Sequence, residues 1–223
     1  MPTLLIADDH PLFRAALRGA AREAAEDIET LESGTLDETI AALEARTDID
    51  LVLLDLHMPG NHGLAGLAAI RAQFPAVAVV LVSANEDPHV VRRAIDHGAA
   101  GYIPKSAGLD EMREAIATVL ACEEWLPPAL RGAVARAHSA PRDADLAARL
   151  ASLTPQQFRV LVLVAEGLLN KQIADRLDVQ ERTVKAHLSA IFDKLGARNR
   201  TQAGVILREL ELSDPSRQVK DDG

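Results

Sequence analysis

The stretch that decides the fold is DLVLLDLHMPG, residues 50–60. It opens with an apolar run of the kind found in buried parallel strands, and a Met-Pro-Gly sequence typical of a turn follows shortly after Asp55. Asp55 should therefore lie at the carboxyl end of a central strand, where open α/β sheets carry their ligands and chemistry. A strand-end Asp that only caps the next turn or helix is the competing interpretation, and Asp55 alone does not decide between the two.

Three more apolar runs end at chemically useful side chains. Residues 3–7 precede Asp8-Asp9, residues 78–82 precede Ser83, and residues 101–104 precede Lys105. The carboxyl ends of neighbouring parallel strands share one edge of the sheet, so these groups should converge on Asp55. Clustered carboxylates repel one another unless a cation lies among them, and hard oxygen ligands at a half-open site suit Mg²⁺. The residues themselves indicate an acidic metal site beside an aspartate that can accept a phosphoryl group.

These motifs resemble the receiver domain of two-component response regulators. The resemblance covers about the first half of the chain, and the motifs that carry it, in the family's order, are Asp8-Asp9-His10-Pro11, Leu54-Asp55-Leu56-His57-Met58-Pro59, Ser83-Ala84 and Gly101-Tyr102-Ile103-Pro104-Lys105. The resemblance implies an α/β fold with a doubly wound, five-stranded parallel sheet. It also implies that Asp55 is the phosphoacceptor.

The resemblance assigns roles to the residues around Asp55. It implies that Asp9, Asp55 and the main-chain carbonyl of His57 hold Mg²⁺, with Asp8 assisting through water. It implies that Lys105 pairs with the phosphoryl group.

Two further positions match the family's switch. The resemblance implies that Ser83 donates a hydrogen bond to the phosphoryl group. Tyr102 matches an aromatic switch position, whose ring turns inward when Ser83 moves.

Composition bounds the class of protein. The chain has 223 residues, of which 48% are hydrophobic, enough for one or two domains with a real core. No run approaches the ~18 apolar residues of a membrane span, and the first residues show no secretory signal. Cys122 is the single cysteine, which fits a reducing cytoplasm. We therefore expect a cytoplasmic protein without membrane contact.

Charge divides the chain into two unlike parts. Residues 1–122 carry 9 Lys and Arg against 19 Asp and Glu, whereas residues 152–208 carry 9 against 5. An acidic unit is thus joined to a basic unit that can touch phosphates. We place the receiver at 1–122, a Pro- and Ala-rich linker with helical parts at 123–151, a DNA-binding domain at 152–212 and a flexible polar tail at 213–223.

The basic unit reads as an all-α, four-helix domain containing a helix-turn-helix. Thr154 before Pro155 is a good N-cap for its first helix, and Asn170 can cap the second. The third helix, Glu181 to Lys194, buries Val184, Leu188 and Ile191 at helical spacing. Its opposite face carries Lys185, Ala186 and Ser189, which could enter a DNA major groove. The alternative is an ordinary amphipathic helix with a solvated face.

Motif context favours DNA binding. The unit resembles the LuxR-type helix-turn-helix over nearly all of residues 152–208, through Leu153-Thr154-Pro155, Ala165 to Ala174, Arg182 to Leu188 and Lys194 to Arg200. With the receiver, the whole resembles a response regulator of the NarL/FixJ type.

That likeness implies which residues meet DNA. It implies that Lys185, Ala186 and Ser189 face bases. The residues implied to contact phosphates are Lys171, Thr183, Arg198 and Arg200. Residues 201–210 form either a dimer face or a helix packed on its own domain. Gln157 stands where the family usually carries Glu, so a local salt bridge should be missing.

The expected function is phosphorylation-controlled transcription regulation, without enzymatic turnover. Its expected partners are a sensor histidine kinase, double-stranded DNA and, when phosphorylated, a second copy of the chain. Two other classes stay open at this point. One is an Asp-nucleophile phosphatase or mutase, although His57 stands where such enzymes need a second Asp. The other is a regulator that ignores phosphorylation, or whose basic domain binds a protein.

Overall fold

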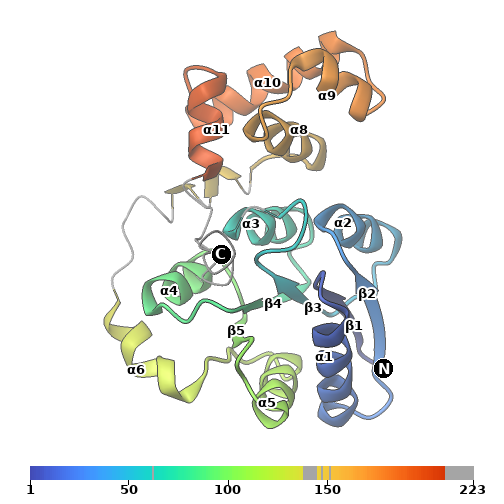
Figure 1. The fold of residues 1–223 in the computed structure, drawn as a ribbon, viewed down its shortest axis with the longest axis vertical. Helices are drawn as coiled ribbons and strands as arrows, with labels where there is room; N and C mark the ends of the chain where they lie inside the picture. Colours follow the sequence, from blue (N-terminus) through green and yellow to red (C-terminus); the bar gives the residue numbers. More distant parts are fainter. Residues whose placement is uncertain (62, 138–144, 147, 151, 209–223) are drawn as a thin grey trace, which may run out of the picture.

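The structure is a computed structural model that describes residues 1–61, 63–137, 145–146, 148–150 and 152–208. Within them the chain forms an α/β N-terminal domain and an all-helical C-terminal domain (Figure 1). The tail expected at 213–223 lies outside the described residues.

Strands and helices alternate through the N-terminal domain. The strands are β1 Thr3–Ala7, β2 Glu29–Ser33, β3 Leu51–Asp55, β4 Ala78–Ser83 and β5 Gly101–Pro104. The helices are α1 Pro11–Ala24, α2 Leu36–Ala45, α3 Leu64–Gln73, α4 Pro88–Asp96 and α5 Leu109–Leu120. The strands pair in parallel in the order β2-β1-β3-β4-β5, which confirms the doubly wound sheet.

Strands β1, β3, β4 and β5 are buried on both faces because they are largely apolar, whereas the edge strand β2 is more polar and more exposed. In β1, Leu4 and Ile6 pack into one core with α1 and α5, whereas Leu5 and Ala7 pack into the other with α2 and α3. This period-two division follows from side chains alternating across a strand. Figure 1 shows α1 and α5 on one side of the sheet and α2 and α3 on the other.

The C-terminal domain contains α8 Pro155–Ala165, α9 Asn170–Arg176, α10 Glu181–Leu195 and α11 Arg200–Arg208. Thr154 caps α8 as predicted: its hydroxyl accepts from the Gln157 N–H, and the Gln157 side chain accepts from the Thr154 N–H. The Asn170 prediction is wrong by one position. The N-cap of α9 is Leu169, and Asn170 is the first helical residue.

Gln157 does more than cap. Its Oε1 also accepts a hydrogen bond from Lys194 Nζ at 2.8 Å, and the same ammonium donates to the Ser152 carbonyl at 2.6 Å. A neutral amide thus takes the position expected for a carboxylate. The contact between α8 and α10 persists as a hydrogen bond instead of a salt bridge.

The linker contains ordered structure of its own. Helix α6, Pro128–Arg136, packs against α4 and buries Val134. Just before it, Trp125 is 1% exposed and lies in the core formed by α1, α5 and the sheet. The beginning of the expected linker is therefore part of the N-terminal domain's core.

The two domains meet at α8, which packs against α3 (Figure 1). Arg159 Nη2 lies 3.7 Å from Glu44 Oε2 across this contact. A cavity of about 470 Å³ remains between the domains, with Leu36 on one wall and Phe158 on the other. The interface is thus loosely packed. Across the described residues, no helix combines the length and apolarity needed to span a bilayer.

Candidate phosphoacceptor site and DNA interface

Asp55 is the centre of the acidic site. It ends β3 and is 0% exposed. Its Oδ1 accepts from the His57 N–H at 3.1 Å, and its Oδ2 accepts from Lys105 Nζ at 2.9 Å. The position arises because β3 pairs between β1 and β4, so that its end lies between theirs.

Lys105 links two strand ends. Its ammonium lies 2.9 Å from Asp55 Oδ2 and 2.9 Å from Asp8 Oδ2. The ring of Phe13 lies below the same ammonium, 5.2 Å from the centroid, within range of a cation–π contact. The structure thus brings the predicted Lys105 and the two buried carboxylates together.

The pKa values of this pair follow from burial and charge. Burial raises the pKa of Asp55, and the hydrogen bond and charge of Lys105 offset that only in part. Burial alone would lower the pKa of Lys105, but the hydrogen bonds and charges of Asp55 and Asp8 outweigh it, so that its pKa is raised. Lys105 is therefore a fixed cation, whereas the Asp55 carboxylate is an energetically costly anion that favours further positive charge.

The donor set fits a divalent cation. One ligand atom from each of Asp8, Asp9, His10 and Asp55 lies within 4.8 Å of the others. Asp8 Oδ2 and Asp9 Oδ1 are buried, and they lie 2.9 Å from Lys105 Nζ and 2.7 Å from His10 Nδ1, respectively. Clustered carboxylate oxygens of this kind are what a hard cation such as Mg²⁺ would take.

Ser83 and Tyr102 form the neighbouring part of the site. Ser83 ends β4 one residue after Val82, which pairs with Asp55. Its Oγ accepts from the Asn85 N–H at 3.1 Å, and the Tyr102 hydroxyl donates to the Asn85 carbonyl at 2.5 Å. The Tyr102 ring is buried in this structure. Burial raises the pKa of the phenol to about 12, with a smaller opposing effect of the Ser83 hydrogen bond.

Residue patterns alone missed four participants. His10 is given no role by the sequence motifs, yet its ring joins the ligand cluster. Phe13 supports Lys105, Arg14 Nη1 donates to the Asp8 carbonyl at 2.6 Å, and Asn61 Nδ2 donates to the Asp55 carbonyl at 2.8 Å. His10 and Phe13 lie just after the Asp8-Asp9 pair, a position that could have suggested them. Asn61 gives no comparable signal.

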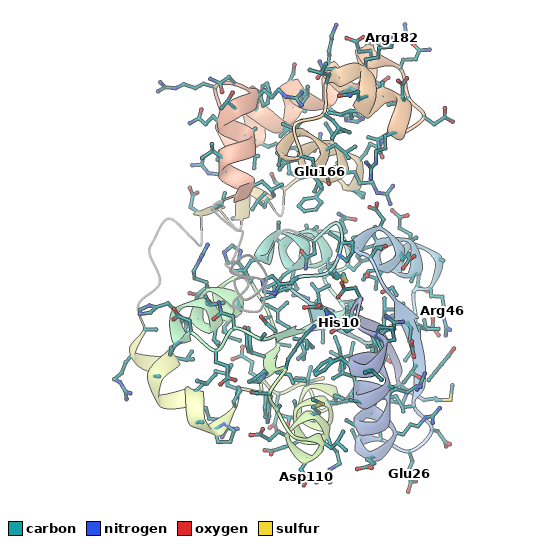
Figure 2. The ribbon with its side chains drawn as sticks, in the orientation of Figure 1. His10, Glu26, Arg46, Asp110, Glu166 and Arg182 are labelled. Atoms are coloured by element: carbon teal, nitrogen blue, oxygen red, sulfur yellow. The ribbon has the colours of Figure 1, made fainter. Side chains whose placement is uncertain are left out.

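The second candidate surface is the outer face of α10. Val184, Leu188 and Ile191 are buried as predicted, while Lys185, Ala186 and Ser189 are exposed. Figure 2 shows Arg182, near the start of α10, on the side of the domain away from the N-terminal domain. The face predicted to read bases is therefore open to solvent in this structure.

The predicted phosphate-contacting residues differ in their surroundings. Lys171 and Arg198 are exposed, and Thr183 is half-buried. Arg200 is also half-buried and donates to Asn170 Oδ1 at 3.0 Å and to the Leu168 carbonyl. Its guanidinium therefore ties α11 to the start of α9.

The last described helix has two faces. Ala203 and Leu207 are buried, and α11 packs against α8. Val205 is 47% exposed on the other side. Packing on its own domain thus accounts for part of the apolar surface of α11.

Known families match both domains. The family described as Response regulator receiver domain matches residues 4–117, and the family described as Bacterial regulatory proteins, luxR family, matches residues 151–207. The chain is 42% identical over 206 residues to the Glycerol metabolism activator of Pseudomonas putida, covering 91% of this chain and 93% of that protein. It is 34% identical, with the same coverage, to the Nitrate/nitrite response regulator protein NarL of Escherichia coli K12.

Solved structures agree on the architecture. The RcsB response regulator of Salmonella typhimurium superposes with a TM-score of 0.57 at 22% identity, covering 93% of this chain and 99% of that one. A structure of two RcsB dimers bound to two parallel DNAs gives 0.55 at 22% identity, covering 94% and 97%. The family matches and the relatives show that this chain belongs to the response regulators of the NarL/FixJ type, with a receiver domain and a LuxR-type DNA-binding domain.

Proposed function

We propose that Asp55 accepts a phosphoryl group from a sensor histidine kinase and that this event controls DNA binding by the C-terminal domain. The observation that carries the proposal is the buried Asp55 carboxylate, which accepts a hydrogen bond from Lys105 and lies within 4.8 Å of ligand atoms of Asp8 and Asp9. The relatives are transcriptional response regulators. We place the protein in the cytoplasm, where DNA and a kinase donor domain meet it.

The pocket's own residues would orient and neutralise the reacting groups. An Asp55 carboxylate oxygen forms the new O–P bond as the N–P bond to the donor histidine breaks, and the imidazole leaves with the electron pair. Lys105 balances charge on the phosphoryl oxygens, and Ser83 donates a hydrogen bond to one of them. Asp8, Asp9, Asp55 and the His57 carbonyl would hold Mg²⁺, which supplies the charge needed for a carboxylate to meet an anion.

The output is proposed to be duplex binding by paired copies of the C-terminal domain. Lys185, Ala186 and Ser189 would face bases, and Lys171, Thr183 and Arg198 would meet phosphates. One relative in structure was solved as RcsB dimers on DNA. Two modules joined in a homodimer bind paired half-sites more tightly than one, because the second contact becomes intramolecular.

The acceptor is tested with a small phosphodonor. Acetyl phosphate and Mg²⁺ should add one phosphoryl group to the intact chain, measured by mass spectrometry, and EDTA should prevent it. Asp55→Asn should block the addition, whereas Asp50→Asn, at the start of the same segment, should not. Continued labelling of Asp55→Asn would place the acceptor elsewhere.

DNA output is tested by footprinting on genomic fragments with and without acetyl phosphate and Mg²⁺. Protection should strengthen with phosphorylation and weaken steeply with salt, because binding releases counterions. Retention on duplex DNA that does not change with salt concentration would argue that the basic domain binds a protein partner instead. Steady hydrolysis of a generic phosphoester by the purified chain would revive the phosphatase class.

A further inference from the structure

The segment that follows β3 carries the His57 carbonyl, one of the proposed Mg²⁺ ligands, and ends in a tight turn. The Asn61 N–H donates to the Met58 carbonyl at 3.0 Å, which closes the turn. Pro59 and Gly60 occupy its corner, and Gly60 has a φ of 80°. This combination is typical of a type II turn, whose third residue needs the left-handed backbone that glycine adopts without strain. The turn begins at the residue directly after His57.

The side chain of Asn61 ties this segment to the strand before it and to the helix after it. Its Nδ2 donates to the Asp55 carbonyl at 2.8 Å, and its Oδ1 accepts from the Gly66 N–H at 3.1 Å. The second bond takes the place of an N-cap. The first N–H groups of a helix have no partner within it, and Gly63, at the N-cap of α3, makes no side-chain cap. The two ends of one amide therefore span the segment that contains His57.

The contact with Gly66 leaves no room for a side chain. A Cβ added at Gly66 would stand 2.4 Å from Asn61 Oδ1 and 2.9 Å from Asn61 Cγ. The amide of Asn61 would have to move away, and it would then lose its bonds to the Gly66 N–H and to the Asp55 carbonyl. Gly66→Ala should therefore release the same amide as Asn61→Ala does, while Asn61 itself stays in the sequence.

Other contacts hold the same segment without the amide. The His57 N–H donates to Asp55 Oδ1 at 3.1 Å, and the Pro59 carbonyl accepts from the Leu36 N–H at 3.0 Å. Removing the Asn61 amide should therefore loosen the segment without unfolding the domain. The direction of the His57 carbonyl is then no longer fixed from both sides. Mg²⁺ demands near-ideal octahedral geometry, so a ligand that is free to turn should bind it more weakly.

We propose that Asn61 is a positioning residue for the Mg²⁺ site, which acts by fixing the segment that presents the His57 carbonyl. The inference rests on the proposed function, in which this carbonyl and the carboxylates of Asp8, Asp9 and Asp55 hold the ion. Groups that orient metal ligands through hydrogen bonds typically change metal affinity by about 10–100-fold when they are removed. The receiver motifs of this chain give Asn61 no role.

Calorimetric titration of the unphosphorylated full chain with MgCl₂ tests the proposal directly. Asn61→Ala should bind Mg²⁺ about tenfold more weakly than the wild type, and Gly66→Ala should show a similar loss. Gly19→Ala is the matched control, because Gly19 is also helical and nothing lies within 4 Å of its added Cβ. It should keep the wild-type affinity. Wild-type affinity in Asn61→Ala or in Gly66→Ala would overturn the proposal.

The dependence of phosphoryl addition on Mg²⁺ separates positioning from a general structural defect. With acetyl phosphate as donor, Asn61→Ala should need about tenfold more Mg²⁺ for its half-maximal rate. At saturating Mg²⁺ it should reach the wild-type rate. A rate that stays low at saturating Mg²⁺ would show that the amide supports the receiver in another way, and would refute the proposal. Wild-type protein that neither binds Mg²⁺ nor gains a phosphoryl group would instead overturn the proposed function.

Discussion

The acidic pocket and the outer face of α10 differ in how far their charged side chains are buried and contacted by other protein groups. Lys105 is 20% exposed, and its ammonium contacts two carboxylates and an aromatic ring. Lys185 is 64% exposed, and its Nζ lies 3.0 Å from Glu181 Oε1, one helical turn away. In the pocket, protein groups already contact the lysine, so the geometry of the site exists before a ligand binds. The helix face is largely hydrated and gains its contacts only on binding. The same residue type should therefore respond differently to the same change in the two places.

Lys105→Ala should give the largest effect. It leaves two buried carboxylates without their cation, and the rate of phosphoryl addition should fall by about 100-fold or more, as when a preorganised charge is removed from a reacting site. Stability should fall by about 3 kcal/mol at neutral pH, as for a broken buried ion pair. Intact mass against time measures the rate, and a urea titration measures the stability. Unphosphorylated DNA binding should be unchanged, and a near-normal rate would contradict the role of Lys105.

Lys185→Ala should show the reverse pattern. Affinity for the duplex site should fall by about tenfold, the scale of one lost base contact, while phosphoryl addition proceeds at the wild-type rate. Because the exposed pair with Glu181 contributes little, the unfolding midpoint should move only slightly. Fluorescence anisotropy with labelled duplex measures the affinity. Loss of phosphoryl addition in this variant would show that the two regions are not separate.

Arg198 and Arg200 sharpen the comparison within the DNA-binding domain. Arg198→Ala should lower the slope of log affinity against log salt by about 1, because it removes one phosphate contact. Arg200→Ala should leave that slope unchanged and destabilise the domain by about 1–2 kcal/mol, because Asn170 and the Leu168 carbonyl lose their donor. Anisotropy over a salt series and thermal melting separate the two outcomes. A slope change in Arg200→Ala would mean that its guanidinium reaches the backbone of DNA.

Asp55→Asn should give the smallest effect, on the stability of the receiver without Mg²⁺. Burial raises the folded-state pKa of Asp55, so its ionisation opposes folding. This loss of unfolding free energy is absent below the unfolded-state pKa of Asp55. It grows as the pH rises above about 4 and reaches its full value above the folded-state pKa. The variant should therefore be more stable than wild type at pH 7 by on the order of 1 kcal/mol, and the difference should shrink toward pH 4. Urea unfolding in EDTA at both pH values measures it, and a less stable variant at pH 7 would contradict it.

The sheet and the cluster around Asp55 could be predicted because their signals are local. Four of the five strands are apolar runs, and parallel pairing then forces the residues after these runs to one edge. Lys105 meets Asp55 across 50 positions of sequence for that reason alone.

Contacts set by side-chain direction could not be predicted in this way. The hydrogen bonds of Arg200 and of the Asn61 side chain depend on the paths of loops. No periodic pattern of apolar residues predicts those paths. Asn170 was placed at a cap because its residue type favours one, but Leu169 takes that position and the Gln172 side chain accepts from its N–H. The linker was recognised by its prolines, whereas the parallel bridge between Trp125 and Gly101 requires the sheet edge to be known first.

The close approach of the main chain at residue 125 to Gly101 has a genetic consequence. Every missense change in a glycine codon adds at least one carbon, and none of the resulting side chains fits the space that remains. Replacements at Gly101 should therefore destabilise the receiver whatever their polarity or charge, while the same codon changes at Gly108, where nothing lies within 4 Å of an added Cβ, should not.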